Sequence, residues 1–126
     1  MSSNFFLGKH LICEVYEVDP ELLKDENFLR DVLLEAAKAT GSTILGDFFY
    51  KFGGGEGVTG LIAIAESHLS IHTWPEHGYA AIDIFTCGSH VDPWKGLEVI
   101  KKRLRPKRVQ TNEMGRGLIE EEQRIV

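Results

Sequence analysis

Residues 59–87 read TGLIAIAESHLSIHTWPEHGYAAIDIFTC, and this stretch decides the fold. Apolar side chains alternate with small or polar ones, which predicts three β-strands at residues 59–66, 68–74 and 79–87. The first two strands are divided near Ser67, and the letters PEHG at residues 75–78 predict a turn before the third. Connections this short join antiparallel neighbours, so the stretch predicts an antiparallel sheet.

Two helices are expected on either side of this stretch. Asp19 and Asp92 are each followed by proline, the pattern of an N-cap and the first helical position. Apolar residues at helical spacing follow both, namely Phe28, Leu29, Val32, Leu33, Ala36 and Ala37, and then Trp94, Leu97, Ile100 and Leu104. We expect the first helix to break near Asp25 and to end at Gly41.

The remaining strands are predicted at residues 9–18, 43–52 and 107–111. The glycine- and charge-rich tail from Asn112, which includes residues 120–122 and Arg124, is expected to be solvated or loosely docked. The order β-α-β-β-β-β-α-β predicts an α+β fold, a two-layer sandwich of one antiparallel sheet with two helices on one face. Its open face and edges favour burial against a second copy.

Composition limits the class of protein. The 126 residues predict a single domain, and 43% hydrophobic with 26% charged residues is ordinary for a soluble protein. A net charge of −5 without a basic stripe argues against a nucleic-acid partner. The longest apolar run, residues 60–65, is too short to cross a membrane, and residues 1–12 lack the features of a secretory signal. We therefore expect a cytoplasmic protein in which Cys13 and Cys87 stay as thiols.

Residues 66–76, ESHLSIHTWPE, hold two serines, two histidines and two glutamates, an unusual set for a core strand. In one strand His68, Ser70, His72 and Trp74 share a face. Ser67 lies at the break between strands, where the alternation can reset, so we expect it near His72.

The residues alone leave several interpretations open. His68 and His72 can be hydrogen-bonded interior histidines. A metal site would draw on His68, His72, His77, His90 and Cys87, but their spacing in a strand is unfavourable. A hydrolase triad of Ser67, His72 and Asp83 lacks the G-x-S-x-G motif. Glycines 53–55 could cradle phosphate, but the lysine of a P-loop is missing.

A resemblance goes further. Residues 57–93, GVTGLIAIAESHLSIHTWPEHGYAAIDIFTCGSHVDP, closely resemble the prokaryotic S-adenosylmethionine decarboxylase family, as do GKHL at residues 8–11 and PWK at residues 93–95. The likeness covers most of the chain, and ESHLSIHTWPE is highly specific. The family is pyruvoyl-dependent, is made as a proenzyme, and includes relatives that decarboxylate arginine or ornithine.

The resemblance implies a set of roles. The chain would cut itself between Glu66 and Ser67 into a β chain, 1–66, and an α chain, 67–126, whose Ser67 becomes a pyruvoyl group. His72 would be the processing base, supported by Thr59, a threonine where the family also uses serine. The pyruvoyl ketone would form a Schiff base with the substrate amine, and Cys87 would be the proton donor. No metal is predicted, because the histidine spacing in a strand is unfavourable for a metal site.

Substrate and partner are also implied. The resemblance implies S-adenosylmethionine as the substrate, whose decarboxylated product is the aminopropyl donor for polyamine (spermidine) synthesis. It also implies a homodimer with active sites at its interface. Phe52 would stack on adenine, and Glu76 lies near the substrate. The loop after Phe52 departs from the family pattern, because it is one residue longer and adds Glu56. Since a carboxylate suits a cationic side chain, arginine or ornithine stays an alternative, as does a non-enzymatic binding homologue.

Overall fold

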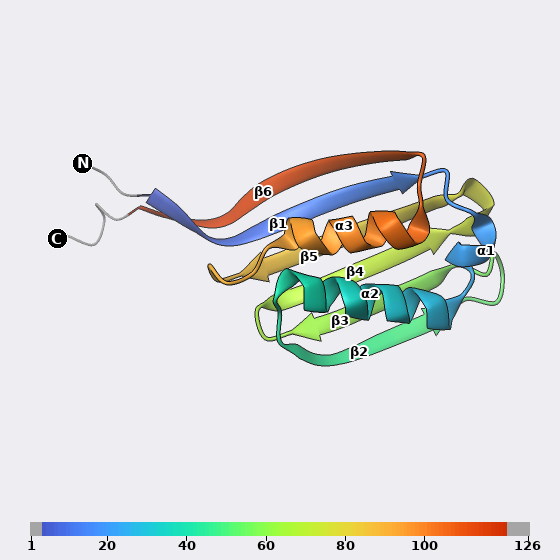
Figure 1. The fold of residues 1–126 in the computed structure, drawn as a ribbon, viewed down its shortest axis with the longest axis horizontal. Helices are drawn as coiled ribbons and strands as arrows, with labels where there is room; N and C mark the ends of the chain where they lie inside the picture. The colour runs from blue at the N-terminus through green and yellow to red at the C-terminus, as the bar shows by residue number, and fades with distance from the viewer. Residues whose placement is uncertain (1–3, 121–126) are drawn as a thin grey trace.

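The computed structural model describes residues 4–120, which form one antiparallel sheet with its helices on a single face (Figure 1). The elements in chain order are β1 (Asn4–Tyr16), α1 (Pro20–Leu23), α2 (Glu26–Thr40), β2 (Ile44–Lys51), β3 (Val58–Ile64), β4 (Ser67–Trp74), the 3₁₀ turn η1 (Pro75–His77), β5 (Tyr79–Cys87), α3 (Pro93–Leu104) and β6 (Arg108–Glu120). The strand order is β2-β3-β4-β5-β1-β6, and every neighbouring pair is antiparallel. The predicted two-layer α+β sandwich is confirmed.

Carboxylate caps determine where the helices begin. Asp19 accepts a hydrogen bond from the Glu21 N–H at 2.9 Å and caps α1. Asp25 accepts one from the Phe28 N–H at 3.0 Å and caps α2, which confirms the predicted break near Asp25. α2 ends at Gly41, whose φ of 88° is a conformation that suits glycine.

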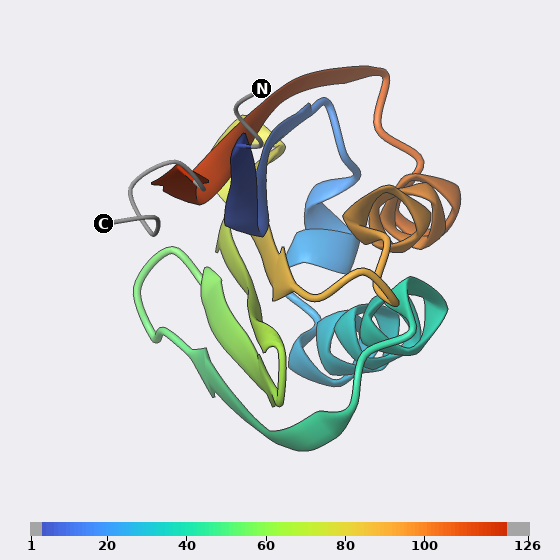
Figure 2. The same ribbon diagram turned by 90° about the vertical axis from the view of Figure 1, so that its left-hand side faces the viewer.

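The core lies between the two long helices and the sheet, as Figure 2 shows with the helices on one side. β4 contributes Leu69, Ile71 and Thr73 to it, and all three are buried. Alternate residues of the same strand face the other way, which confirms that His68, Ser70, His72 and Trp74 share the open face.

Two strand boundaries were predicted wrongly. β1 begins at Asn4 instead of residue 9, and β6 continues to Glu120 where a loose tail was expected. The two strands pair along their whole length, from Asn4 with Glu120 to Tyr16 with Arg108. The part of the tail at residues 121–126 lies outside the described residues.

The open face of the sheet carries large apolar side chains. Phe48, Tyr50, Leu61, Trp74 and Met114 are each between 42% and 63% exposed, and their register places them on the side away from the helices. No helix within residues 4–120 is long and apolar enough to cross a membrane.

Candidate active site

The turn between β3 and β4 holds the Glu66–Ser67 peptide bond, which the family resemblance implies is cut. Ala65 and Glu66 form a two-residue turn, with Ile64 paired to Ser67 across it. The Ala65 N–H donates to the Thr43 carbonyl and the Cys87 N–H donates to the Glu66 carbonyl, both at 2.9 Å. Ser67 has a φ of 146°, which L-residues rarely adopt, and such strain costs about 1–3 kcal/mol. The Glu66 carbonyl is thus held by a donor next to a strained residue.

The Glu66 side chain is anchored from two other segments. Its carboxylate accepts hydrogen bonds from the Thr43 N–H at 3.0 Å, the Thr43 hydroxyl at 3.4 Å and His90 Nε2 at 2.9 Å. Only 11% of the side chain is exposed. These donors, His90 first and Thr43 next, lower the pKa of the Glu66 carboxyl.

Ser67 and Cys87 are brought to the same end of the sheet. Ser67 pairs with Thr86, the residue before Cys87. The Ser67 hydroxyl lies 3.4 Å from His68 Nδ1, a long hydrogen bond, and the His68 ring meets the edge of Phe85 at 5.8 Å between centroids. Cys87 is half-buried, unlike Cys13 in the core.

His72 and Thr59 form a second cluster further along the sheet. They are cross-strand partners, and a hydrogen bond of 3.1 Å joins the Thr59 hydroxyl to His72 Nδ1. Beside them is a hollow of about 310 Å³, lined by side chains that include Phe52, Thr59, His72, Trp74 and Glu76. The structure thus brings together most of the residues to which the family resemblance gives roles in substrate binding and in support of processing.

Glu76 enters this hollow under the glycine loop. A Cβ on Gly55 would lie 3.3 Å from Glu76 Oε2, so a side chain at position 55 would crowd the carboxylate. Within residues 4–120, the Glu76 side chain makes no hydrogen bond or ion pair. Its carboxylate is available to a ligand.

Ser67 and His72 are not neighbours within the chain. β4 is paired regularly with β5 from Ser67 with Thr86 to Trp74 with Tyr79, so no bulge shortens the strand. Five residues of extended chain span about 17 Å. The expectation that Ser67 lies near His72 in the same chain is therefore wrong, and the candidate site is divided into two half-sites.

Glu56 lies outside the hollow. Its carboxylate pairs with Lys24 Nζ at 3.4 Å and Lys51 Nζ at 3.8 Å. Lys24 also pairs with Glu21 at 3.2 Å, and the pKa of Lys24 is raised by Glu21 first and Glu56 next. The two lysines offset the negative charge of Glu56, which the sequence had suggested as a partner for a cationic substrate.

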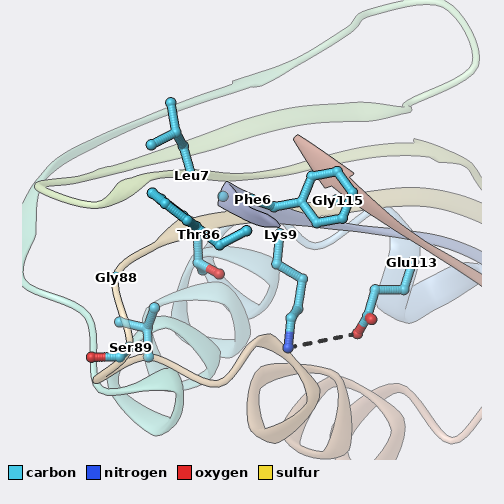
Figure 3. Close-up of a pocket in the computed structure, with 11 residues that line it drawn as sticks. Phe6, Leu7, Lys9, Thr86, Gly88, Ser89, Glu113 and Gly115 are labelled. Atoms are coloured by element: carbon cyan, nitrogen blue, oxygen red, sulfur yellow. Dashed lines mark ion pairs between the residues drawn. The ribbon is translucent and has the colours of Figure 1, made fainter. Parts of the chain in front are cut away.

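Another hollow, of about 440 Å³, opens at the Ser67 end of the sheet (Figure 3). Lys9 and Glu113 lie in it 3.9 Å apart, and Thr86 and Gly88, which flank Cys87, also line it. Ser67, His72 and Cys87 are not among its lining residues. In residues 4–120 no three histidine, cysteine or acidic side chains are grouped to hold a metal ion.

Comparison with known proteins assigns the family. Residues 9–117 match the family model of S-adenosylmethionine decarboxylase. The chain belongs to the S-adenosylmethionine decarboxylase family. It is 50% identical over 115 residues to the S-adenosylmethionine decarboxylase proenzyme of Thermotoga petrophila, which covers 91% of this chain and 88% of that protein. Its identity to the proenzyme of Caldanaerobacter subterraneus is 46% over 114 residues, 90% of this chain and 91% of that one.

A solved structure supports the same family assignment. The fold matches the crystal structure of the adenosylmethionine decarboxylase from Aquifex aeolicus with a TM-score of 0.86, at 36% sequence identity, over 93% of this chain and 96% of that one. The family resemblance and the expectation of a decarboxylase, a carboxy-lyase, are confirmed.

Sequence reasoning missed Thr43 and gave His68 and His90 no role beyond the open metal and interior-histidine interpretations. All three contact Glu66 or Ser67 in the structure. For Thr43 and His90 the sequence carries no signal, because they lie 23 and 24 positions from Glu66 in loops. His68 adjoins Ser67, and that adjacency was the available signal.

The two cysteines should differ in reactivity. Burial, and then the charge of Asp83, raises the pKa of the Cys13 thiol to about 12, so at pH 8 only about one in ten thousand molecules carries that thiolate. We expect iodoacetamide to alkylate the native protein once, at Cys87, and to leave Cys87→Ser unmodified, as measured by intact mass. Equal labelling of both thiols, or of Cys13 alone, would contradict the structure.

Proposed function

We propose that this protein cuts its own chain between Glu66 and Ser67 and then decarboxylates S-adenosylmethionine with a pyruvoyl group made from Ser67. The observation that carries the proposal is the hydrogen bond of 2.9 Å from the Cys87 N–H to the Glu66 carbonyl, next to the strained Ser67. Membership of a family whose relatives are proenzymes supports it.

The first step is an N→O acyl shift. The Ser67 oxygen attacks the Glu66 carbonyl carbon, a C–O bond forms, the C–N bond breaks, and the hydroxyl proton passes to the departing nitrogen. Negative charge develops on the Glu66 oxygen, where the Cys87 N–H already donates a hydrogen bond. Such a donor is an oxyanion hole, and losing one costs about 10²–10³ in rate in a well-studied enzyme. The step also relieves the constraint of the turn on Ser67.

The second step is elimination. A base removes the Ser67 α-proton, the Cβ–O bond breaks, and Glu66 leaves as a carboxylate. The resulting dehydroalanine takes up water and releases ammonia, which leaves a pyruvoyl group. His72 is the proposed base, since a neutral imidazole nitrogen can accept a proton, and the Thr59 hydroxyl orients the ring through their hydrogen bond of 3.1 Å.

The position of Ser67 fits a pyruvoyl group. Ser67 begins β4, so a group made from it would end a new chain beside the Cys87 backbone. The pyruvoyl group supplies an electron sink for the bond that breaks when carbon dioxide leaves. The Cys87 thiol, half-buried at the end of β5, is then the proposed proton donor to the substrate carbon.

The two half-sites require a second copy. Ser67 and Cys87 lie at one end of the β4–β5 pair, and His72 and Thr59 lie toward the other. A two-fold axis running across the strands, between two facing sheets, would place one end of a protomer over the opposite end of its partner. We therefore propose a homodimer in which each Ser67 uses His72 of the partner subunit.

The open face suits this assembly. It carries Phe48, Leu61, Trp74 and other large apolar side chains that are about half exposed in the single chain. A patch of that kind is typical of an interface. The predicted cytoplasmic location, with no membrane or nucleic acid as partner, stays a prediction.

The hollow supports S-adenosylmethionine as the substrate. Phe52 and Trp74 offer aromatic faces for adenine stacking, and the free Glu76 carboxylate can accept hydrogen bonds from substrate donors. Glu56, the reason to consider arginine or ornithine, is paired with two lysines outside the hollow. The decarboxylated product would serve polyamine synthesis.

We expect the purified protein to contain two chains, 1–66 and 67–126, and Ser67→Ala to stay one chain because it lacks the attacking oxygen. Intact mass and borohydride-reducible carbonyl content measure the cut. Carbon dioxide release should occur with S-adenosylmethionine and not with arginine or ornithine. An uncut, inactive wild-type protein would overturn the proposal, and turnover of arginine or ornithine alone would overturn the substrate.

Co-expression tests the shared site. His72→Ala and Ser67→Ala should each stay uncut alone, but in mixed dimers the His72→Ala chain meets an intact His72 on its partner. With equal expression about half of the His72→Ala chain should then be cut. Mass spectrometry distinguishes the two chains by composition. No cutting in the mixed dimers would place the base in the same chain.

Glu56→Gln tests the role of that carboxylate. Because Glu56 is already paired, we expect its loss to leave the choice of substrate unchanged and to lower stability by no more than about 1 kcal/mol, as is usual for surface ion pairs. Parallel assays with the three substrates and urea unfolding measure both. If Glu56→Gln loses arginine activity that the wild type has and gains S-adenosylmethionine activity, the conclusion that Glu56 does not select the substrate is wrong.

A further inference from the structure

The strongest unassigned feature is the set of contacts on the Glu66 side chain, which takes no part in the proposed bond-making and bond-breaking steps. Three segments meet there: the β3–β4 turn, the link from α2 to β2 that contains Thr43, and the loop from β5 to α3 that contains His90. We propose that Thr43 and His90 form a clamp that positions the scissile carbonyl of Glu66 for the acyl shift, and this rests on the proposed self-processing.

Thr43 holds both residues of the turn. Its carbonyl accepts from the Ala65 N–H at 2.9 Å, while its own N–H and hydroxyl donate to the Glu66 carboxylate at 3.0 and 3.4 Å. The turn is therefore tied to the helix layer through backbone and side chain together.

His90 is aimed at Glu66 by the shape of its loop. Gly88 has a φ of 96°, and a Cβ at that position would lie 2.9 Å from His90 Cε1, so the imidazole folds back over a residue that must lack a side chain. The same loop is tied down where the Asp92 N–H donates to the Thr40 carbonyl at 2.9 Å. The ring thereby reaches the Glu66 carboxylate at 2.9 Å.

The effect on the carbonyl follows from the geometry. The Glu66 side chain is fixed by Thr43 and His90, and the Glu66 carbonyl by the Cys87 N–H. Two anchors on one residue leave little freedom for rotation of its peptide plane. Attack at a carbonyl requires a near-attack geometry, and positioning of this kind raises the rate without contact between the clamp and the reacting atoms. Thr43 and His90 are therefore positioning residues.

A double-mutant cycle on self-processing tests the clamp. Freshly synthesised wild type, His90→Ala, Glu66→Ala and the double variant are compared by the fraction cut over time, measured by intact mass. We expect His90→Ala to slow cutting by about tenfold and Glu66→Ala to slow it at least as much, because Glu66→Ala also removes the contacts with Thr43. The double variant should be no slower than Glu66→Ala, because the His90 contact is already lost in that variant. His90→Gln, which keeps a donor near the Nε2 position, should restore most of the rate.

Controls separate the clamp from general damage. His77→Ala removes another exposed histidine and should cut at the wild-type rate, and thermal unfolding should show that all variants fold. Once cut, His90→Ala should turn over within about twofold of wild type per pyruvoyl group, because the clamp acts on the bond already broken. If the wild type cuts itself and His90→Ala cuts at the same rate, the clamp is overturned but the proposed function is not. Additive losses, or turnover that falls together with cutting, would also overturn it, whereas an uncut wild type overturns the proposed function.

Discussion

The hydrogen bond from the Cys87 N–H to the Glu66 carbonyl is the constraint on which the site depends. It joins the end of β5 to the β3–β4 turn. It therefore sets the position of the peptide bond between Glu66 and Ser67, the residue with a strained backbone. Because the donor belongs to the backbone, its direction is determined by the pairing of β4 with β5, from Ser67 with Thr86 onward. The same pairing carries the Cys87 side chain to the turn. Sheet register therefore decides the chemistry at this end.

Much of the fold could be predicted because the core-facing strands follow simple alternation. Leu69, Ile71 and Thr73 face the helices, and the caps at Asp19, Asp25 and Asp92 mark helix starts by local hydrogen bonds. The start of β6 was predicted at residues 107–111, but its continuation from Asn112 could not be, because β6 is an edge strand that lies mostly in solvent. Its glycines suggested a tail, but Gly115 and Gly117 lie under Phe6 and Leu7 of β1, where a Cβ would meet those side chains at 2.4 and 3.0 Å. The cross-strand contact that explains them joins residues more than 100 positions apart.

For the candidate site, the sequence suggests which residues take part, but it does not give their geometry. Resemblance named Ser67, His72 and Cys87, but the length of β4 keeps Ser67 from His72, which no motif expresses. The sequence also could not show that the charge of Glu56 is offset by neighbouring lysines. Its partners Lys24 and Lys51 come from the α1–α2 junction and the end of β2, so the sequence shows a free carboxylate where the structure has a paired one.

Strand β4 contributes Ser67 to one half-site and His72 to the other, so the positions of both depend on its register. Because side chains alternate, a slip of β4 by one residue would turn His72 into the core and expose Leu69 and Ile71. Burial of Leu69 and Ile71 opposes that slip, and so does Thr73, whose hydroxyl donates to the Leu23 carbonyl and accepts from the Val58 N–H, both at 2.8 Å. The proposed cut at Glu66 would leave this register intact, because β3 pairs with β4 from Thr59 with His72 to Ile64 with Ser67 independently of the turn. The sheet can therefore lose a covalent bond at its turn and still hold the new chain end in place.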